Sequence, residues 1–90
     1  MTIEYNEAEI TGGWSNDYIK VNDTYTIQKF RAIQDTVEWE MQEEYAYFLP
    51  IYFKQQVVAG YNYEVIYDIG NDEYLQVNYF EDLDGNIFFS

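Results

Sequence analysis

The spacing of apolar positions predicts one helix in the first half of the chain. Between residues 23 and 43 apolar side chains recur at steps of three and four, which places them on one stripe of a helix. These positions are Ile27, Phe30, Ile33, Val37 and Met41. Asn22 or Asp23 is a suitable N-cap because its side chain accepts a hydrogen bond from the first turn. We therefore expect a helix at roughly residues 23–43.

The second half of the chain has the pattern of β-strands. Residues 48–58 are rich in β-branched and aromatic types, and Pro50 within them indicates a sheet edge or a bulge. Residues 61–69 alternate between apolar and mostly polar positions, which is typical of a half-buried strand. Two further strands are predicted at residues 74–80 and 87–89.

Turn residues separate these strands at short intervals. Gly70-Asn71-Asp72 predicts one turn, and Asp84-Gly85 predicts a second one before the last strand. The expected fold class is α+β, with one long helix packed on a curved antiparallel sheet of about four strands. We expect residues 1–90 to form a single domain in which residues 1–21 are an extended N-terminal arm containing Gly12-Gly13.

Composition and charge narrow the classes of partner. The chain has four Lys and Arg residues and 17 Asp and Glu residues, so its net charge is −13. This negative charge opposes binding to nucleic acid or to anionic membranes. Eleven Tyr and six Phe supply a large apolar area, so we expect a folded domain within an acidic, solvated shell.

The chain contains neither Cys nor His. It needs no disulfide, so a reducing compartment is permitted, and Met1 leads directly into Thr2-Ile3-Glu4-Tyr5 without the pattern of a secretory signal. No apolar run reaches transmembrane length. A cytoplasmic location is the default expectation, although a signal peptide removed earlier would leave the same record.

Catalysis and metal binding are not expected. Without His or Cys the common nucleophile–base pairs cannot form, and 17 acidic residues make carboxylate pairs such as Glu38/Glu40 or Glu43/Glu44 expected by chance. The segment from Asp82 to Asn86 has a glycine at its fourth position, whereas a calcium loop needs glycine at the sixth. We predict no enzyme activity, no cofactor and no metal site.

One motif is specific. Gln56-Val57-Val58-Ala59-Gly60, followed by Tyr61-Asn62-Tyr63, resembles the first hairpin of the cystatin superfamily, and most of all that of the stefins. The resemblance covers roughly residues 12–86. Further positions at which a stefin keeps similar residues are Ile33, Val37, Phe48, Ile51, Phe53, Val65, Ile69, Gly70, Leu75, Phe80 and Leu83.

The resemblance implies a reversible, competitive inhibitor of papain-like cysteine proteases of the cathepsin type. Its binding residues would come from the arm, from the first hairpin and from the second hairpin, and they are Gly12, Gly13, Gln56, Val57, Val58, Ala59, Gly60, Leu83 and Asp84. Small side chains at the first hairpin suit a thin wedge that enters a narrow cleft, and Gly60 lets the chain turn tightly.

Two features differ from the family pattern. A stefin usually carries Pro or Trp at the second hairpin, whereas here Asp84 follows Leu83, and the sequence printed here stops at Ser90 within the last strand. The alternative is a cystatin-fold module that binds proteins or peptides through its aromatic face or strand edge without inhibiting. We expect a monomer, with a domain-swapped dimer as a second state because β-branched Val57 and Val58 strain a short loop.

Overall fold

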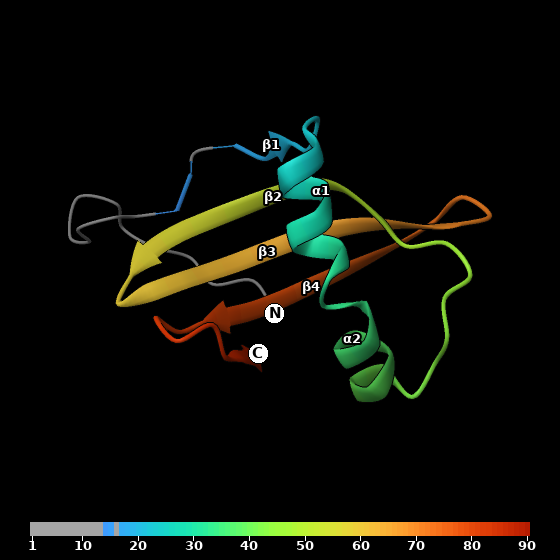
Figure 1. Ribbon diagram of the computed structural model, residues 1–90. Coiled ribbons are helices and arrows are strands. Elements are labelled where there is room, and N and C mark those ends of the chain that lie inside the picture. The colour runs from blue at the N-terminus through green and yellow to red at the C-terminus, as the bar shows by residue number, and fades with distance from the viewer. Residues whose placement is uncertain (1–13, 16) are drawn as a thin grey trace.

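The computed structural model describes residues 14–15 and 17–90 and shows helices on one face of an antiparallel sheet (Figure 1). The sheet has five strands in the order β1-β2-β3-β4-β5. The elements, in chain order, are β1 Ile19–Lys20, α1 Thr24–Arg31, α2 Gln34–Met41, β2 Leu49–Val58, β3 Gly60–Gly70, β4 Glu73–Glu81 and β5 Ile87–Phe89. The predicted fold class, α+β and cystatin-like, is confirmed.

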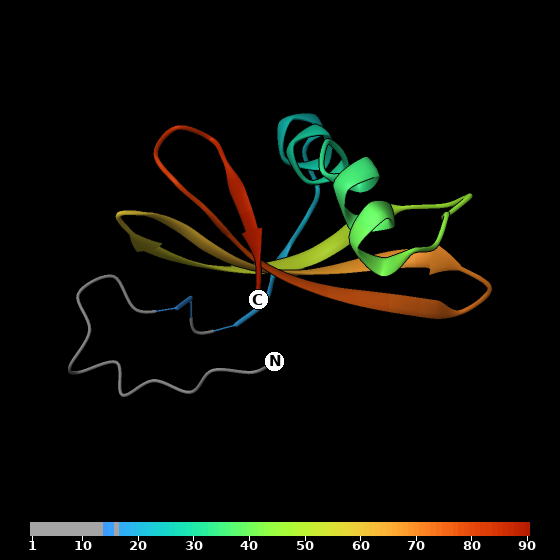
Figure 2. The same ribbon diagram turned by 90° about the horizontal axis from the view of Figure 1, so that it is seen from below.

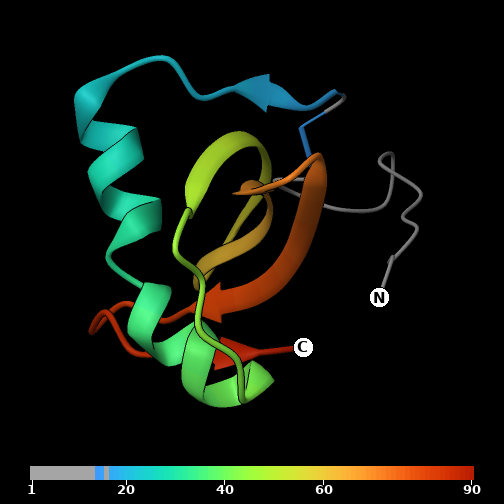
Figure 3. The ribbon, with the colours of Figure 1, turned by 90° about the vertical axis from the view of Figure 1, so that its right-hand side faces the viewer.

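The helical segment begins where the sequence predicts and is divided in the middle. Asp23 is the N-cap, and its carboxylate accepts a hydrogen bond of 2.9 Å from the Thr26 amide. At Ile33 the backbone opens to φ −91° and ψ 5°, so α1 and α2 follow different directions in Figure 3. The bond from the Val37 amide to the carbonyl of Ile33, the N-cap of α2, is 2.9 Å long and begins the second helix.

The predicted apolar stripe is correct in its middle, whereas Ile27 at its start is only partly buried and lies outside the core cluster. Phe30, Ile33 and Val37 are buried against the sheet, whereas Met41 is 48% exposed. Met41 is the last residue of α2, and the chain reverses immediately after it through Gln42, whose backbone is left-handed. The end of the helix therefore leaves its final apolar side chain only partly covered.

The sheet contains one strand more than the sequence predicts. Ile19 and Lys20, which we expected in the extended arm, pair with Phe53 and Tyr52 of β2 and form the edge strand β1. Two residues are too few for a periodic signal, so only the contact with β2 identifies them as a strand. The bulge expected at Pro50 is present as a shift in the β2–β3 register between Pro50 and Tyr52.

Aromatic side chains dominate the core between helices and sheet, and Figure 2 shows both helices on the same side of the sheet. The Phe30 ring packs 5.0 Å from that of Phe53 and 5.2 Å from that of Tyr63, measured between centroids. The fully buried Tyr67 hydroxyl donates a hydrogen bond of 2.8 Å to the Phe30 carbonyl. Burial raises the pKa of this hydroxyl far above its ordinary value of 10.0, so it remains a donor. None of the helices described here is long and apolar enough to cross a membrane.

Replacing Tyr67 with phenylalanine tests the link between helix and sheet. Tyr67→Phe keeps the ring but leaves the buried Phe30 carbonyl without this donor. We expect the free energy of unfolding to fall by about 1–2 kcal/mol. Urea unfolding measures it, and Tyr74→Phe on an exposed ring is the control, with an expected change within about 0.5 kcal/mol. Equal effects in both variants would contradict a structural role for the Tyr67 hydroxyl.

Candidate functional site

The hairpin between β2 and β3 ends in a very short turn. Val57 pairs with Tyr61 and Val58 pairs with Gly60, so Ala59 alone lies outside the ladder. Val57 is 52% exposed and Val58 is 41% exposed, although both are apolar. The predicted segment Gln56–Gly60 therefore forms a thin projection with apolar side chains on its surface.

Gln56 differs from its neighbours because its side chain is buried. It is only 3% exposed, and its Oε1 accepts a hydrogen bond of 2.9 Å from Asn62 Nδ2 on the opposite strand. This bond joins the two strands just below the turn. Gln56 is therefore buried and stabilises the hairpin, whereas Val57, Val58 and Ala59 are exposed on its surface.

Gly60 is required at its position by both conformation and space. Its φ of +116° lies in a region that side chains strongly disfavour. A Cβ there would lie 2.3 Å from the Glu81 carbonyl oxygen and 3.1 Å from the Asp82 Cα, both in the backbone at the end of β4. The tip of the first hairpin is thus pressed directly against the start of the second one.

The second hairpin is organised by the Asp82 side chain. Its carboxylate accepts hydrogen bonds of 2.9 Å from the amides of Asp84 and Asn86, and its amide donates to the Asn86 carbonyl at 2.9 Å. The bonds with Asn86 and Asp84 lower the pKa of Asp82 below its ordinary value of 3.8. Leu83 stands at the tip of this closed loop with 79% of its surface exposed.

The same loop shows why proline does not fit easily at position 84. The family pattern would favour Asp84→Pro, and on sequence grounds we expect tighter protease binding if the turn tolerates it. In the structure the Asp84 amide donates to the Asp82 carboxylate, and proline has no amide hydrogen. That substitution would therefore remove one of the bonds that shape the hairpin.

Both hairpins lie at the same end of the sheet, at the left in Figure 1. The described part of the arm reaches this end as well, because the Ser15 amide donates a hydrogen bond of 3.0 Å to the Gln55 carbonyl. Gly12 and Gly13 lie outside the described residues. Of the predicted site residues, the structure thus brings Gln56–Gly60 together with Leu83 and Asp84.

A groove beside the first hairpin was not identified from the sequence. It has a volume of about 480 Å³, and Lys29 crosses it to form an ion pair of 3.1 Å with Glu81. Burial lowers the pKa of Lys29, but Glu81 and Tyr63 raise it by more, so the ammonium stays charged. Tyr61, next to Gly60, lines the groove and is partly exposed. The alternation of apolar and polar residues along this strand gave no sign of that exposure.

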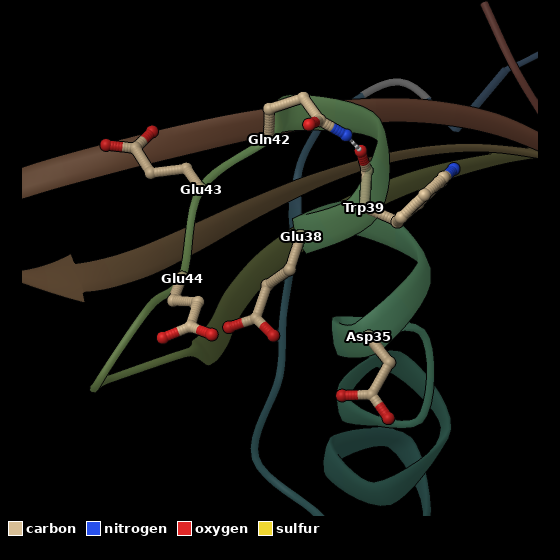
Figure 4. A pocket seen from close by; sticks show the side chains of 6 residues that line it. All are labelled: Asp35, Glu38, Trp39, Gln42, Glu43 and Glu44. Atoms are coloured by element: carbon tan, nitrogen blue, oxygen red, sulfur yellow. Dashed lines mark hydrogen bonds between the residues drawn. The ribbon is translucent and has the colours of Figure 1, made fainter.

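A second surface hollow carries several carboxylates. It lies along α2 and the segment that follows, and its volume is about 440 Å³. Figure 4 shows the side chains that line it, which are Asp35, Glu38, Trp39, Gln42, Glu43 and Glu44. The Glu38 carboxylate accepts a hydrogen bond of 2.7 Å from the Tyr45 amide, so it holds the connection to β2. Within residues 14–15 and 17–90 no group of acidic side chains is arranged to hold a metal ion.

Replacing Gly60 with alanine tests the contact between the two hairpins. We expect Gly60→Ala to lower the free energy of unfolding by at least about 2 kcal/mol, because it adds strain at positive φ and a clash with the Glu81 carbonyl. Gly85→Ala is the matched control, since Gly85 also has positive φ but nothing lies within 4 Å of the added Cβ. Denaturant unfolding of both variants gives the comparison, and an equal loss would contradict the steric argument.

Acid unfolding tests the role of the Asp82 carboxylate. Because its pKa is lowered in the folded protein, its contribution to stability is present above pH 3.8 and is lost as the pH falls through the folded value. We expect Asp82→Asn to reduce the dependence of stability on pH in this acidic range. Asp84→Asn, on an exposed side chain, is the control. Unfolding by urea at neutral and acidic pH measures the difference, and an unchanged dependence in Asp82→Asn would refute it.

Of the comparisons with known proteins, the search of curated sequences gave a match. No family model matches the chain, and no solved structure matches it. The chain is similar to Cystatin-A of Mus musculus, with 36% identity over 53 residues, which are 59% of this chain and 55% of Cystatin-A. The chain thus spans about half the length of this curated relative. The match and the helix-on-sheet fold together confirm the predicted resemblance to the stefin-type cystatins.

Proposed function

We propose that this protein is a reversible, competitive inhibitor of papain-like cysteine proteases and that it acts in the cytoplasm. The observation that carries the proposal is the projection at one end of the sheet, where Val57 and Val58 remain exposed on a hairpin with a single residue at its tip. Leu83 adds an exposed apolar side chain from the neighbouring hairpin. The similarity to Cystatin-A supports the same conclusion.

The proposed mechanism is occlusion of the active-site cleft. A papain-like protease has a narrow cleft, and a projection with small side chains can fill it next to the catalytic pair. The first hairpin is held by the Gln56–Asn62 bond and by the close approach of Gly60 to β4, so it loses little conformational entropy on binding. The apolar surface of Val57 and Val58 then supplies favourable burial.

The three contact regions are expected to contribute unequally. Leu83 offers one apolar side chain, but Asp84 beside it would lose hydration on entering the cleft. We therefore assign most of the affinity to Val57–Gly60 and to the arm with Gly12 and Gly13, and a smaller part to the second hairpin.

A charge placed on the first hairpin should weaken the inhibition of papain. We expect Val57→Asp to weaken binding to papain about 30-fold or more, because the carboxylate must be desolvated in the cleft. Asn71→Asp is the matched control, since it adds the same charge in the exposed β3–β4 turn and Asp tolerates its positive φ. Active-site titration of papain compares the two. An unchanged inhibition constant in folded Val57→Asp, or no inhibition by the parent protein, would refute the proposal.

The ranking of the contact regions has its own test. We expect deletion of residues 1–13 to raise the dissociation rate at least about tenfold, because affinity changes within one interface fall mainly on that rate. Leu83→Ala should cost about 1 kcal/mol or less. Stopped-flow measurements against one protease provide both values. A larger loss from Leu83→Ala than from removal of the whole arm would reverse the ranking.

A further inference from the structure

A group of polar and aromatic side chains attaches the segment before β1 to the sheet. Tyr18, the residue before β1, donates a hydrogen bond from its hydroxyl to the Glu64 carboxylate of β3. The Lys54 ammonium on β2 lies 4.7 Å from the centroid of the Tyr18 ring, which is close enough for a cation–π interaction. The Tyr52 ring meets the Tyr18 ring edge to face, with centroids 6.4 Å apart. We call Tyr18, Lys54 and Glu64 the Tyr18 cluster.

The register of the sheet explains why the members of the Tyr18 cluster meet. Lys54 and Glu64 are partners across β2 and β3, so their side chains project from the same face of the sheet. Phe53, which precedes Lys54, packs against α1, so Lys54 projects from the face away from the helices. Ile19 pairs with Phe53, and this brings Tyr18 beside Lys54. The cluster therefore joins the arm to both strands of the first hairpin.

The described residues of the arm continue along β2 toward the tip of the first hairpin. The Ser15 amide donates to the Gln55 carbonyl at 3.0 Å, and the Gln55 amide donates to the Ser15 hydroxyl at 3.4 Å. Gln55 follows Lys54 and precedes the hairpin segment Gln56–Gly60. Tyr18 thus contacts β2 and β3 between strand β1 and the point at which Ser15 reaches the base of the hairpin.

The side-chain contacts add to a short backbone ladder. β1 has only two residues, and each further residue of the arm that becomes ordered loses conformational entropy. The bond from the Tyr18 hydroxyl has a charged acceptor, which makes it stronger than a bond between neutral groups. Partial burial and the neighbouring Glu64 raise the pKa of Tyr18 to about 12, so the hydroxyl remains a donor at neutral pH. The Tyr18 cluster therefore offsets part of the entropy that ordering the arm costs.

We propose that the Tyr18 cluster positions the N-terminal arm for binding to the protease. The inference rests on the proposed function, in which the arm with Gly12 and Gly13 contributes to affinity. The cluster and the Ser15 bonds fix the chain beside the first hairpin at a point two residues beyond Gly13. Conformational entropy is then lost when the protein folds and not when the protease binds, which strengthens binding. Tyr18 is a positioning residue that acts through the arm.

Removal of the arm separates positioning from general stabilisation. Tyr18→Phe deletes the bond to Glu64 and keeps the ring beside Lys54. In the full chain we expect it to raise the dissociation rate from papain about threefold to tenfold. In a protein that lacks residues 1–13 it should change this rate less than about twofold, because the segment that it positions is absent. Stopped-flow measurements give the four rates, and urea unfolding verifies that each variant folds.

Tyr74→Phe is the matched control for Tyr18→Phe. Tyr74 is 60% exposed and lies near the start of β4, at the end of the strand away from the second hairpin. The loss of its hydroxyl should change the dissociation rate less than about twofold in the full chain.

A second set of variants tests the hydrogen bond itself. Glu64→Ala removes the acceptor and should raise the dissociation rate by about as much as Tyr18→Phe. The two substitutions together should exceed the larger single effect by less than about twofold, because both delete the same bond. Glu64→Gln keeps an oxygen that accepts the bond, so its dissociation rate should lie closer to that of the parent protein than to that of Glu64→Ala.

Exchange of the Ser15 amide with solvent measures the attachment of the arm without a protease. This amide is bonded to the Gln55 carbonyl, and we expect its exchange to become about threefold to tenfold faster in Tyr18→Phe. The amide of Val65, a fully buried residue in β3, is the internal control and should exchange at an unchanged rate. NMR spectroscopy of the two proteins gives both rates.

The outcomes distinguish this proposal from the proposed function. An equal effect of Tyr18→Phe with and without residues 1–13 would show that the cluster does not act through the arm. An unchanged exchange rate of the Ser15 amide would show that the cluster does not hold the arm. Absence of papain inhibition by the parent protein would refute the proposed function, and Ser15 exchange would still decide whether the Tyr18 cluster positions the arm.

Discussion

The packing of Phe30 against the sheet is the interaction on which the other features depend. Its ring contacts Phe53 on β2 and Tyr63 on β3, and its carbonyl accepts the buried Tyr67 hydroxyl. These contacts attach α1 to the two strands that form the first hairpin. The apolar burial supplies most of the energy, and the hydrogen bond defines the position of the helix. The hairpin projects from this base and has a stable direction because its strands are covered there.

Rigidity at the projecting end has a different origin. At this end the backbones of the two hairpins approach each other closely. Gly60 brings the first turn against Glu81 and Asp82, and Asp82 closes the second turn with its own carboxylate. Small side chains keep this end thin, which is the property that the proposed inhibition needs, while the exposed valines provide an apolar surface. The residues that keep this end of the fold rigid therefore lie next to the residues whose shape suits the proposed inhibition.

The sequence by itself determined the helix, four of the strands, both turns and the resemblance to the stefins. These features depend on local rules: a period of three to four for the helix, alternation for the strand at residues 61–69, and turn residues such as Gly70 and Gly85 at positive φ. It also identified Asn22 or Asp23 as a candidate cap and Pro50 as a mark of a sheet edge or a bulge, and the structure has Asp23 as the cap and a bulge after Pro50. Local patterns predicted these features because each is decided within a few residues of the chain.

Only the tertiary structure decided which residues meet across the sheet. Ile19 and Lys20 form a strand because they pair with β2. Met41 is exposed because α2 ends at this residue. The tertiary structure also buried Gln56 behind the surface of the first hairpin and placed the Cβ position of Gly60 against β4. Each outcome depends on contacts between residues far apart in the chain, and no local pattern of side chains records such contacts.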